Sequence, residues 1–406
     1  ERFDGHDFVT DAASKGARGA VVSRPPSSDA DVRLYPVKDT LVALGALAAH
    51  RRRDLRAPVV AITGSSGKTT TKDLTSAALA ATKRVHATRG NLNNRIGMPL
   101  TLLGAPEDAE VVVLEMGSNE PGEIRTLAQI ARPDVGVVTT VGEAHLERLG
   151  SLEGVLEEKL DLLRNLAAGG RCVVGDEPPR LAERAREVCA SLRVAGWSRR
   201  ADEDLRPADA TVDVFGRWEF GWRGATVKLP MAGRHAVADA LLALAVADLL
   251  GVPPHEAAAG IARAEAGAMR GEMRRVGSLS IIVDCYNANP QSVRAALDVL
   301  EGQSAGRRVA VLGTMLELGE ESARLHRDVL ADALARPIDL IVATGAFAEA
   351  ARELGATDGG RLVTAADWQE AYPALREWLE GDELVLLKAS RGVALEGILP
   401  LLEQDF

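Results

Sequence analysis

The sequence predicts an α/β fold with buried parallel sheets. Short apolar runs such as Val111–Leu114 and Val135–Thr140 alternate with helical stretches, as in parallel strands joined by crossover helices. A glycine-rich turn follows the strand expected at Val59–Thr63, and a second alternating series begins near Gly271. With 406 residues, of which 46% are hydrophobic, the chain is long enough for two or three domains with ordinary cores.

The first domain is expected to cover only residues 1–57. A strand is predicted at Ala20–Ser23, before the break at Pro25-Pro26, and a helix at Thr40–Arg53. The helix closes with Arg51-Arg52-Arg53, which we interpret as a solvated helix end favoured by the helix dipole.

The central domain is expected to span residues 58–270. A strand at Val59–Thr63 leads through the glycine-rich turn into a helix that begins at about Lys68. Short alternating runs with glycine turns over residues 203–230 predict strands at an edge, and a helix follows at about Arg234–Leu250.

The third domain is expected to span residues 271–406, again with strands and helices in alternation. Its strands are predicted at Leu279–Val283, Arg308–Leu312, Leu340–Ala343 and Leu384–Lys388.

Charge and cysteine content exclude several classes of protein. A formal net charge of -10 argues against non-specific binding to nucleic acid or to an acidic membrane. No apolar run reaches the roughly 18 residues of a membrane-spanning helix, and no signal peptide is recognisable at the start. The three cysteines, Cys172, Cys189 and Cys285, lack disulfide-like or ligand-like spacing, which fits a reducing cytosol. We therefore expect a cytoplasmic protein.

The strongest motif is Thr63-Gly64-Ser65-Ser66-Gly67-Lys68-Thr69-Thr70, between a predicted strand and a predicted helix. Backbone N–H groups of such a turn and of the helix N-terminus bind phosphates. Lys68 would reach the outer phosphates of a nucleotide, and the Thr69 hydroxyl would hold Mg²⁺. The first glycine of the usual pattern is replaced by Ile62. The alternative is a glycine- and serine-rich turn that binds nothing.

Three further residues are candidates for the same site. Glu115 ends an apolar strand at the edge where open α/β sheets bind ligands, so it is a candidate metal ligand. Lys159 falls in the apolar stripe of a helix, where it either extends its amine to solvent or is desolvated and able to form a carbamate with CO₂. His145 follows the strand at Val135–Thr140 and is either a site residue or a surface histidine.

The third domain offers two strand-to-helix turns. At the first, Asp284 could bond a ribose hydroxyl or a ligand amine, and Asn289 could bind substrate or cap the helix that begins at Pro290. At the second, Lys388, Ser390 and Arg391 could clamp a carboxylate or phosphate, although Ser390 could instead simply cap a helix.

The chain resembles the Mur ligase family along nearly its whole length. The matching motifs occur in the family's order: Phe3–Phe8, Thr63–Thr70, Gly90–Asn94 with Gly97–Pro99, Glu115–Gly117, Ala144–Glu147, Lys159, Gly233–His235, Arg270, Asp284–Pro290, Leu316–Gly319 and Lys388–Arg391. The phosphate loop of this family also lacks the first glycine. The resemblance implies a three-domain architecture: a truncated N-terminal domain, a central parallel-sheet ATPase domain and a Rossmann-like C-terminal domain.

Within the family, the match is best to the branch that joins D-alanyl-D-alanine to UDP-N-acetylmuramoyl-tripeptide in peptidoglycan synthesis. The resemblance implies ATP, two Mg²⁺ ions and a carbamylated Lys159 as cofactors, and these two substrates as partners of a monomer. The implied catalytic and metal-binding residues are Lys68, Thr69, Glu115, His145 and Lys159. The implied nucleotide-binding residues are Thr63, Gly64, Ser65, Ser66, Gly67, Lys68, Thr69, Thr70, His235, Arg270, Asp284 and Tyr286. The implied substrate-binding residues are Asn91, Asn93, Asn94, Asn287, Asn289, Lys388, Ser390 and Arg391.

The sequence departs from the family at three places. Ala236 and Asp239 replace two asparagines that contact the adenine side of ATP in the family, so nucleotide affinity or base preference is expected to differ. Thr314 replaces an aspartate. The chain also starts after the first strands of the family's N-terminal domain, so we expect weak binding of the UDP portion and poor ligation.

Two alternatives remain. The first is another amide ligase of the superfamily, such as a folylpolyglutamate-synthetase-like enzyme or a different amino-acid-adding Mur ligase. The second is a regulatory protein that binds ATP through the phosphate loop and catalyses no ligation.

Overall fold

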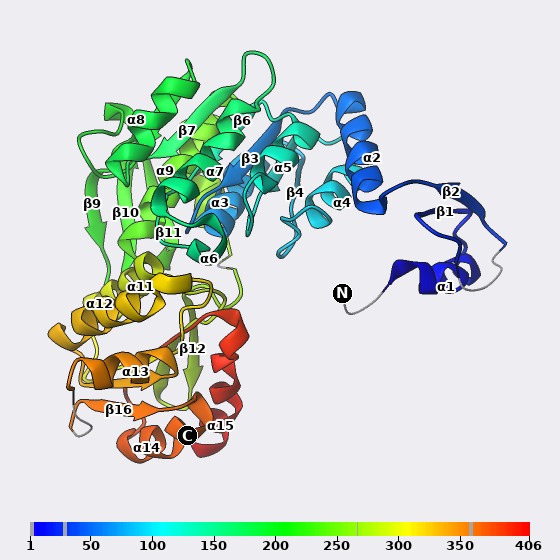
Figure 1. Ribbon diagram of the computed structural model, residues 1–406. Coiled ribbons are helices and arrows are strands. Elements are labelled where there is room, and N and C mark those ends of the chain that lie inside the picture. The colour runs from blue at the N-terminus through cyan, green and yellow to red at the C-terminus, as the bar shows by residue number, and fades with distance from the viewer. Residues whose placement is uncertain (1–3, 27–30, 266, 357–359) are drawn as a thin grey trace.

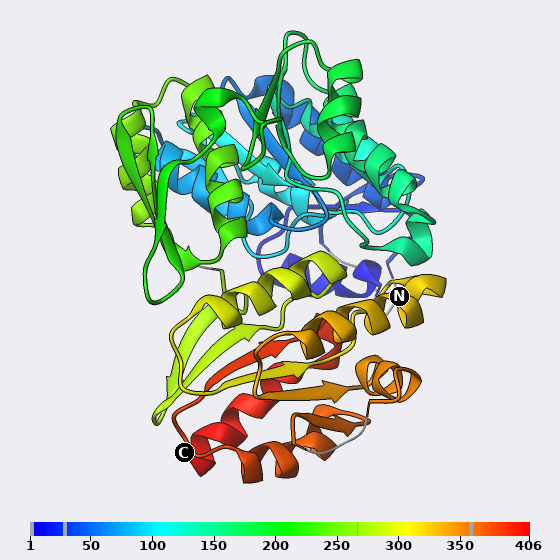
Figure 2. The same cartoon turned by 90° about the vertical axis from the view of Figure 1, so that its left-hand side faces the viewer.

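The computed structural model describes residues 4–26, 31–265, 267–356 and 360–406. Three parts follow one another along the chain. Figure 1 shows a small N-terminal unit, in dark blue, that is joined to the central unit through one helix, and a C-terminal unit below the central one. Figure 2 shows two helices of the C-terminal unit in the layer that faces the central unit.

The N-terminal unit is small and exposed. A 3₁₀ turn, η1 (Gly5–Phe8), and helix α1 (Val9–Ser14) precede two parallel strands, β1 (Gly19–Val22) and β2 (Arg33–Pro36). Helix α2 (Thr40–Asp54) then leads to the central unit.

The basic end of α2 is not the solvated cluster that the sequence suggested. The guanidinium of Arg52 donates to the carbonyl of Ala131 at 2.7 Å and pairs with Asp134 at 2.8 Å, and its side chain is only 13% exposed. Arg51 donates to the carbonyl of Ala105 at 2.7 Å. These arginines therefore fasten α2 to the central unit, because carbonyls at helix and loop ends accept their donors.

The central unit is built on six parallel strands in the order β4-β5-β3-β6-β7-β8. Their bounds are Val85–Ala87 (β4), Val111–Glu115 (β5), Val59–Thr63 (β3), Val135–Val138 (β6), Arg171–Gly175 (β7) and Leu192–Ala195 (β8). The chain runs from β3 outward to β4, returns to β5, and crosses β3 to reach β6. The carboxyl end of β3 is therefore the point at which the strand order reverses, where open α/β sheets bind ligands.

Helices cover both faces of this sheet. One face packs against α3 (Lys68–Ala80), α9 (Arg234–Leu249) and α10 (Pro254–Ala262). The other face packs against α4 (Gly97–Leu103), α5 (Glu123–Ala131), α7 (Leu152–Arg164) and α8 (Pro179–Val188), and the short α6 (Leu146–Leu149) precedes α7. Because both faces are covered, the strands β3, β5 and β6 are buried at every position.

Residues 203–230 differ from the expectation of strands at the edge of the main sheet. After a 3₁₀ turn, η2 (Glu203–Leu205), they contribute to a separate antiparallel sheet of β9 (Ala208–Val212), β10 (Arg217–Trp222) and β11 (Ala225–Ala232). Phe220 and Trp222 bury one face of this sheet in the core shared with α9 and α10. Alternation of apolar and polar residues indicated strands but carried no information on which sheet they join.

The C-terminal unit contains six strands in the order β12-β13-β17-β14-β15-β16, parallel except for β12. Their bounds are Glu272–Val276 (β12), Leu279–Asp284 (β13), Leu384–Lys388 (β17), Arg308–Leu312 (β14), Leu340–Thr344 (β15) and Leu362–Ala365 (β16). Helices α11 (Pro290–Gly302), α12 (Ser322–Ala335) and α13 (Ala346–Glu353) cover one face. Helices α14 (Trp368–Trp378) and α15 (Leu399–Asp405) cover the other, and the 3₁₀ turns are η3 (Gly319–Glu321), η4 (Arg391–Val393) and η5 (Leu395–Ile398).

The cysteines correct a second expectation. Cys172 in β7 and Cys189 after α8 form a disulfide with their Cα atoms 6.5 Å apart, whereas Cys285 is a free, buried thiol. Helix α8 packs against the sheet, and the chain after it brings Cys189 next to Cys172, which lies 17 positions earlier in the sequence. Cysteine spacing in the sequence does not reveal such a pairing.

Within the described ranges, no helix combines the length and the apolar character that crossing a membrane requires.

Candidate active site

The phosphate loop has the conformation that an anion site requires. Gly64 and Gly67 adopt positive φ angles of 151° and 79°, and α3 begins directly after Gly67. A Cβ at Gly64 would lie 1.9 Å from the hydroxyl oxygen of Thr139, so this position needs glycine. Thr139 also donates to the carbonyl of Ser66 at 2.5 Å, which holds the loop against the strand beside it.

Lys68 bends back over the loop. Its ammonium donates to the carbonyl of Gly64 at 2.7 Å. Burial lowers the pKa of Lys68, and the nearby carboxylate of Glu115 opposes that shift. Lys68 therefore lies beside the loop at the N-terminus of α3, where its amine and the N–H groups that the first helical turn leaves open can bind a polyphosphate.

A cavity of about 1130 Å³ opens from this loop and extends between the central and C-terminal units. Most of the residues that the sequence singled out line it. They are Ser65, Ser66, Gly67, Lys68, Thr69, Thr70, Asn91, Asn93, Asn94, Glu115, His145, His235, Arg270, Asp284, Tyr286, Asn287, Asn289 and Lys388. Thr63, Gly64, Lys159, Ser390 and Arg391 are not part of the lining.

Glu115 has one oxygen bonded and one free. It ends β5 and is 1% exposed. Its Oε1 accepts from the Nδ2 of Asn93 at 2.7 Å, and its backbone N–H donates to the hydroxyl of Thr88 at 3.0 Å. Its Oε2 is buried and has no hydrogen-bond partner among the described residues. A buried carboxylate oxygen without a partner is costly unless a cation or donor binds it, so this atom marks a ligand site.

Lys159 lies behind the wall of the cavity. The side chain is 1% exposed, and its ammonium donates to the hydroxyl of Ser118 at 2.6 Å. Ser118 itself lines the cavity. Burial, together with the charge of Lys68, lowers the pKa of Lys159 to about 7. Of the two alternatives that the apolar stripe left open, the structure has the desolvated amine, and the lysine does not extend to solvent.

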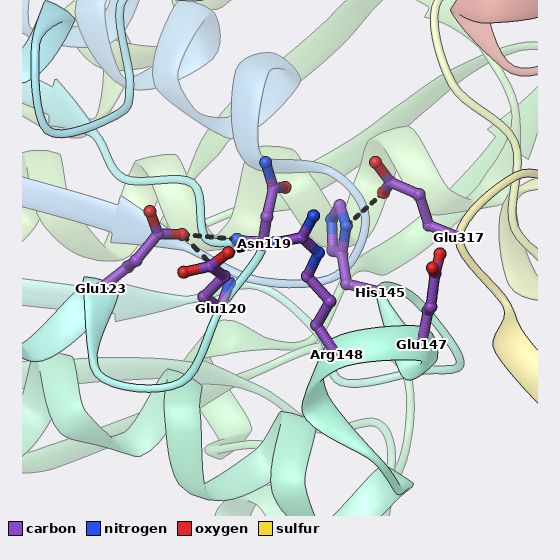
Figure 3. A pocket seen from close by; sticks show the side chains of 7 residues that line it. All are labelled: Asn119, Glu120, Glu123, His145, Glu147, Arg148 and Glu317. Carbon is purple, nitrogen blue, oxygen red and sulfur yellow. Dashed lines mark hydrogen bonds and ion pairs between the residues drawn. The ribbon is translucent and has the colours of Figure 1, made fainter. Parts of the chain in front are cut away.

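His145 reaches across to the C-terminal unit. It has a φ of 55°, and its Nδ1 lies 2.5 Å from Oε2 of Glu317, as the dashed line in Figure 3 shows. The bond from His145 holds the pKa of Glu317 below its usual value. The backbone N–H of Glu147 donates to the carbonyl of Glu317 at 3.2 Å.

This contact borders a second cavity of about 270 Å³. Its lining consists of Asn119, Glu120, Glu123, His145, Glu147, Arg148 and Glu317. Arg148 pairs with Glu120, and Figure 3 shows the side chain of Glu123 directed towards the backbone of Asn119 and Glu120, to which it is bonded at 2.7 and 3.1 Å.

Asp284 and Lys388 face each other at the carboxyl ends of two neighbouring strands. The Lys388 ammonium is 2.8 Å from Oδ2 of Asp284 and donates to the carbonyl of Asn287 at 2.7 Å. In this structure each of the two residues is the partner of the other. Nearby, the Arg270 guanidinium lies 3.9 Å from the ring centroid of Tyr286.

Asn289 caps a helix, which is one of the two roles that the sequence left open, and it also contacts the phosphate loop. Its side chain caps α11 in a capping box with Ser292, and its Nδ2 donates to the hydroxyl of Ser66 in the phosphate loop at 3.0 Å. Gln291, which the sequence did not single out, donates to the hydroxyl of Thr140 at 3.0 Å. The N-terminus of α11 therefore rests directly on the phosphate loop.

The last predicted turn has a different role from the expected clamp. The Ser390 hydroxyl accepts from the backbone N–H of Leu316 at 3.0 Å, and it makes no side-chain cap for η4. Arg391 pairs with Glu396 at 2.8 Å. Both residues thus hold loops of the C-terminal unit and lie outside the cavity lining.

Thr314, which stands where the family has an aspartate, also serves the C-terminal unit. Its hydroxyl accepts from the backbone N–H of Ala346 at the start of α13, at 3.0 Å. This bond satisfies one of the donors that a helix N-terminus leaves open.

Asp239 is a site residue whose ionisation the sequence did not predict. It is 7% exposed, lies against Gly67, and accepts from the hydroxyl of Thr71 at 3.1 Å. Burial raises the pKa of Asp239 to about 7. The sequence flagged this position only as a departure from the family, because burial of the side chain depends on how α9 packs against α3.

The described residues contain no cluster of three or more His, Cys, Asp or Glu side chains placed to hold a metal ion. Among the predicted metal ligands, Glu115 and His145 are the two that belong to these residue types. A magnesium site in this cavity therefore requires further oxygen atoms, and the Thr69 hydroxyl is one that lines it.

Two family models match the chain. The Mur ligase middle domain matches residues 62–247, and the model described as "Mur ligase, glutamate ligase domain" matches residues 269–391. The chain is 37% identical to the UDP-N-acetylmuramoyl-tripeptide--D-alanyl-D-alanine ligase of Bacillus subtilis (strain 168), over 98% of this chain and 88% of that protein. It is 35% identical to the enzyme of the same name from Escherichia coli (strain K12), over 100% of this chain and 89% of that protein.

Solved structures agree with these matches. A crystal structure of MurF from Acinetobacter baumannii has a TM-score of 0.91 at 34% identity, covering 100% of this chain and 89% of that one. MurF ligase from Thermotoga maritima in complex with ADP has a TM-score of 0.86 at 28% identity, covering 100% of this chain and 92% of that one. The sequence matches and the shared architecture establish that this chain belongs to the Mur ligase family.

Proposed function

We propose that the protein is an ATP-dependent ligase that joins D-alanyl-D-alanine to UDP-N-acetylmuramoyl-tripeptide. The observation that carries the proposal is the free, buried oxygen of Glu115 in the cavity that the phosphate loop opens into. The names of the relatives in Bacillus subtilis and Escherichia coli supply the two substrates. The enzyme acts as a monomer in the cytoplasm, in the synthesis of peptidoglycan precursors.

The domain organisation belongs to the same proposal. Residues 1–57 form a UDP-substrate-binding domain, residues 58–270 the ATP-binding domain and residues 271–406 the Rossmann-like C-terminal domain. The separate six-stranded sheets and the two matched stretches, 62–247 and 269–391, support this division.

Three residues that line this cavity offer donor atoms for Mg²⁺. Glu115 and the Thr69 hydroxyl would supply oxygen atoms, and His145 would supply a ring nitrogen. The bond between Nδ1 of His145 and Glu317 is the kind of carboxylate contact that orients a metal-bound histidine. Two bound Mg²⁺ ions would neutralise charge on the transferred phosphoryl group.

A carbamate on Lys159 supplies the missing anionic ligand. With a pKa of about 7, a large share of this amine is neutral near neutral pH. The ammonium first loses a proton to solvent. The neutral amine would then attack CO₂, forming an N–C bond while one C=O π bond opens, and the nitrogen would release a second proton, which leaves a carboxylate-like anion in place of the buried cation. The hydroxyl of Ser118, now bonded to Nζ, can donate to that anion.

In the proposed reaction, the loop amides and Lys68 hold the γ-phosphate while the substrate carboxylate attacks it in line. The bond from the γ-phosphorus to ADP breaks, which leaves an acyl phosphate. The amine of D-alanyl-D-alanine then attacks the acyl carbon, loses a proton to solvent, and phosphate departs. His235, Arg270, Asp284 and Tyr286 face the nucleotide, and the C-terminal unit excludes water that would hydrolyse the acyl phosphate.

The remaining site residues serve the two substrates. Asn91 and Asn94 face UDP-N-acetylmuramoyl-tripeptide from the central unit. Asn287, Asn289 and Lys388 line the cavity from the C-terminal unit, and Ser390 and Arg391 fix the loops behind it.

A coupled assay of ADP release tests the proposal. ADP release should require UDP-N-acetylmuramoyl-tripeptide and D-alanyl-D-alanine together, and Lys68→Ala gives the background rate. Stimulation by glutamate or by a diamino acid in place of D-alanyl-D-alanine would indicate another ligase of the superfamily. ATP binding without acceptor-dependent turnover would indicate a regulatory protein.

A further inference from the structure

Three asparagines lie close together in the turn between β4 and α4, and each makes different contacts. The Asn94 side chain accepts from the backbone N–H groups of Ile96 and Gly97, at 3.0 and 2.9 Å, and so fixes the start of α4. The exposed Asn91 lines the cavity. Asn93 also lines the cavity, and its side-chain amide donates to Oε1 of Glu115 at 2.7 Å.

The backbone of Asn93 is fixed on both sides of that bond. Its carbonyl accepts from Gly117, two residues beyond Glu115, at 2.9 Å, and its N–H donates to the carbonyl of Asn91 at 2.7 Å. A Cβ at Gly117 would lie 3.1 Å from the side-chain amide of Asn93. The turn is therefore fastened to the end of β5, and Gly117 permits the close approach.

The bond constrains the carboxylate of Glu115 without changing its charge. The Asn93 amide occupies Oε1, and the hydroxyl of Thr88 holds the backbone N–H of the same residue. The remaining oxygen, Oε2, has no partner among the described residues. Because an amide is neutral, it leaves the full negative charge of Glu115 for a cation at Oε2, whereas a lysine would cancel it.

We infer that Asn93 is a positioning residue that orients Glu115 for Mg²⁺, and that it does not primarily contact the peptide substrate. This inference rests on the metal-binding role of Glu115 proposed above. Hydrogen bonds to a metal-binding side chain fix its orientation, and their loss typically weakens metal affinity by about 10–100-fold.

Binding of a fluorescent, non-hydrolysable ATP analogue, titrated with Mg²⁺, tests the inference without any turnover. For Asn93→Ala, and for Asn93→Leu, which keeps a similar shape but has no donor, the Mg²⁺ midpoint should rise by about 10–100-fold. Binding of the same analogue in EDTA should change less than about threefold, because the phosphate loop is intact. Leu92→Ala, at an exposed side chain in the same turn, is the matched control and should keep the wild-type midpoint. Equal melting temperatures show that each variant is folded.

The outcomes separate this inference from the proposed function. If Glu115→Ala leaves the Mg²⁺ midpoint unchanged, the metal-binding role of Glu115 is wrong and the inference is lost with it. If Glu115→Ala shifts the midpoint but both Asn93 variants stay within twofold of wild type, only the positioning role is overturned. Equal shifts for Leu92→Ala and the Asn93 variants would also overturn it, since the effect would then belong to the whole turn.

Discussion

The central and C-terminal units each place a lysine and an acid in or beside the same cavity, but they connect them differently. In the C-terminal unit, Asp284 and Lys388 pair with each other at 2.8 Å. In the central unit, Glu115 bonds to an amide and Lys159 bonds to a hydroxyl, and neither forms an ion pair among the described residues. Both lysines are almost fully buried, at 1% and 2% exposure.

The difference distinguishes charged groups that stabilise the fold by pairing, Asp284 and Lys388, from charged groups that can bind a ligand, Glu115 and Lys159. A buried lysine paired with a carboxylate has its charge compensated within the protein. Burying Glu115 with one free oxygen, and Lys159 without an ion pair, costs free energy of desolvation. A bound metal ion would offset this cost at Glu115, and reaction with CO₂ would offset it at Lys159. Of the two sites, the central one is therefore the candidate for chemistry, and the C-terminal one for holding the cavity wall.

The largest effect is expected from Glu115→Gln. This change keeps the shape of the side chain and its bond from Asn93 but removes the negative charge. Ligation turnover should fall by about 10²–10³-fold, the range for loss of one electrostatic contact in an active site. The melting temperature should stay equal or rise, because a buried charge without a counter-ion is removed. Turnover close to wild type in a steady-state assay would show that this carboxylate is not used.

Lys159→Ala should lower turnover by about 100-fold, the upper end for loss of a group that supports a metal site. Added formate or acetate should restore part of the activity, since a small carboxylate can occupy the place of the carbamate. Lys388→Met, measured under the same conditions, should show no such rescue. Undiminished turnover in the Lys159 variant would remove the carbamate from the mechanism.

Asp284→Asn should act mainly on stability. It leaves the ammonium of Lys388, which is 2% exposed, without its carboxylate. The expected loss is about 3 kcal/mol, the lower end of the cost of breaking a buried pair, because Asp284 is partly exposed. The double change Asp284→Asn with Lys388→Met should recover part of that loss in urea unfolding. An unchanged unfolding midpoint in the single variant would contradict the structural role of the pair.

Asp239 is intermediate between the paired Asp284 and the unpaired Glu115. Among the described residues, its carboxyl group accepts a hydrogen bond from the hydroxyl of Thr71 and forms no ion pair. Its pKa is raised from 3.8 to about 7, so the folded state holds a proton that the unfolded state has lost in this interval. Its contribution to stability therefore falls as pH rises from about 4 to about 7 and is constant above that. Asp239→Asn should melt a few degrees above wild type at pH 8 and much closer to it at pH 4. A difference in melting temperature that does not vary with pH would show that Asp239 does not titrate as described.

Much of the fold follows from local patterns. The strands at Val59–Thr63, Arg308–Leu312 and Leu384–Lys388 have the predicted bounds, because continuous apolar runs between turn residues allow few other readings. The helix from Lys68 also begins where the glycine turn predicts. Short polar strands such as β2, which is exposed at every position, carry no such signal.

The connections within the site depended on tertiary structure. Spacing in the apolar stripe indicated that Lys159 could be buried, but its bond to Ser118 depends on the loop that follows β5. The pairing of Asp284 with Lys388 depends on β13 and β17 lying side by side. Paired residues of these strands, such as Ser280 and Leu384, are 104 positions apart in the sequence (384 − 280), so no local pattern contains them. The contact of His145 with Glu317 joins two units, and no local pattern contains it.

The central claim is that a metal ion binds the free oxygen of Glu115 next to the phosphate loop. Anomalous diffraction from crystals grown with Mn²⁺ and a non-hydrolysable ATP analogue tests it most directly. We predict nucleotide phosphates in the Gly64–Thr70 loop and a manganese peak about 2.0–2.3 Å from Oε2 of Glu115, with no peak at Asp284. An occupied nucleotide site with no manganese at Glu115, or an empty loop, would contradict the account.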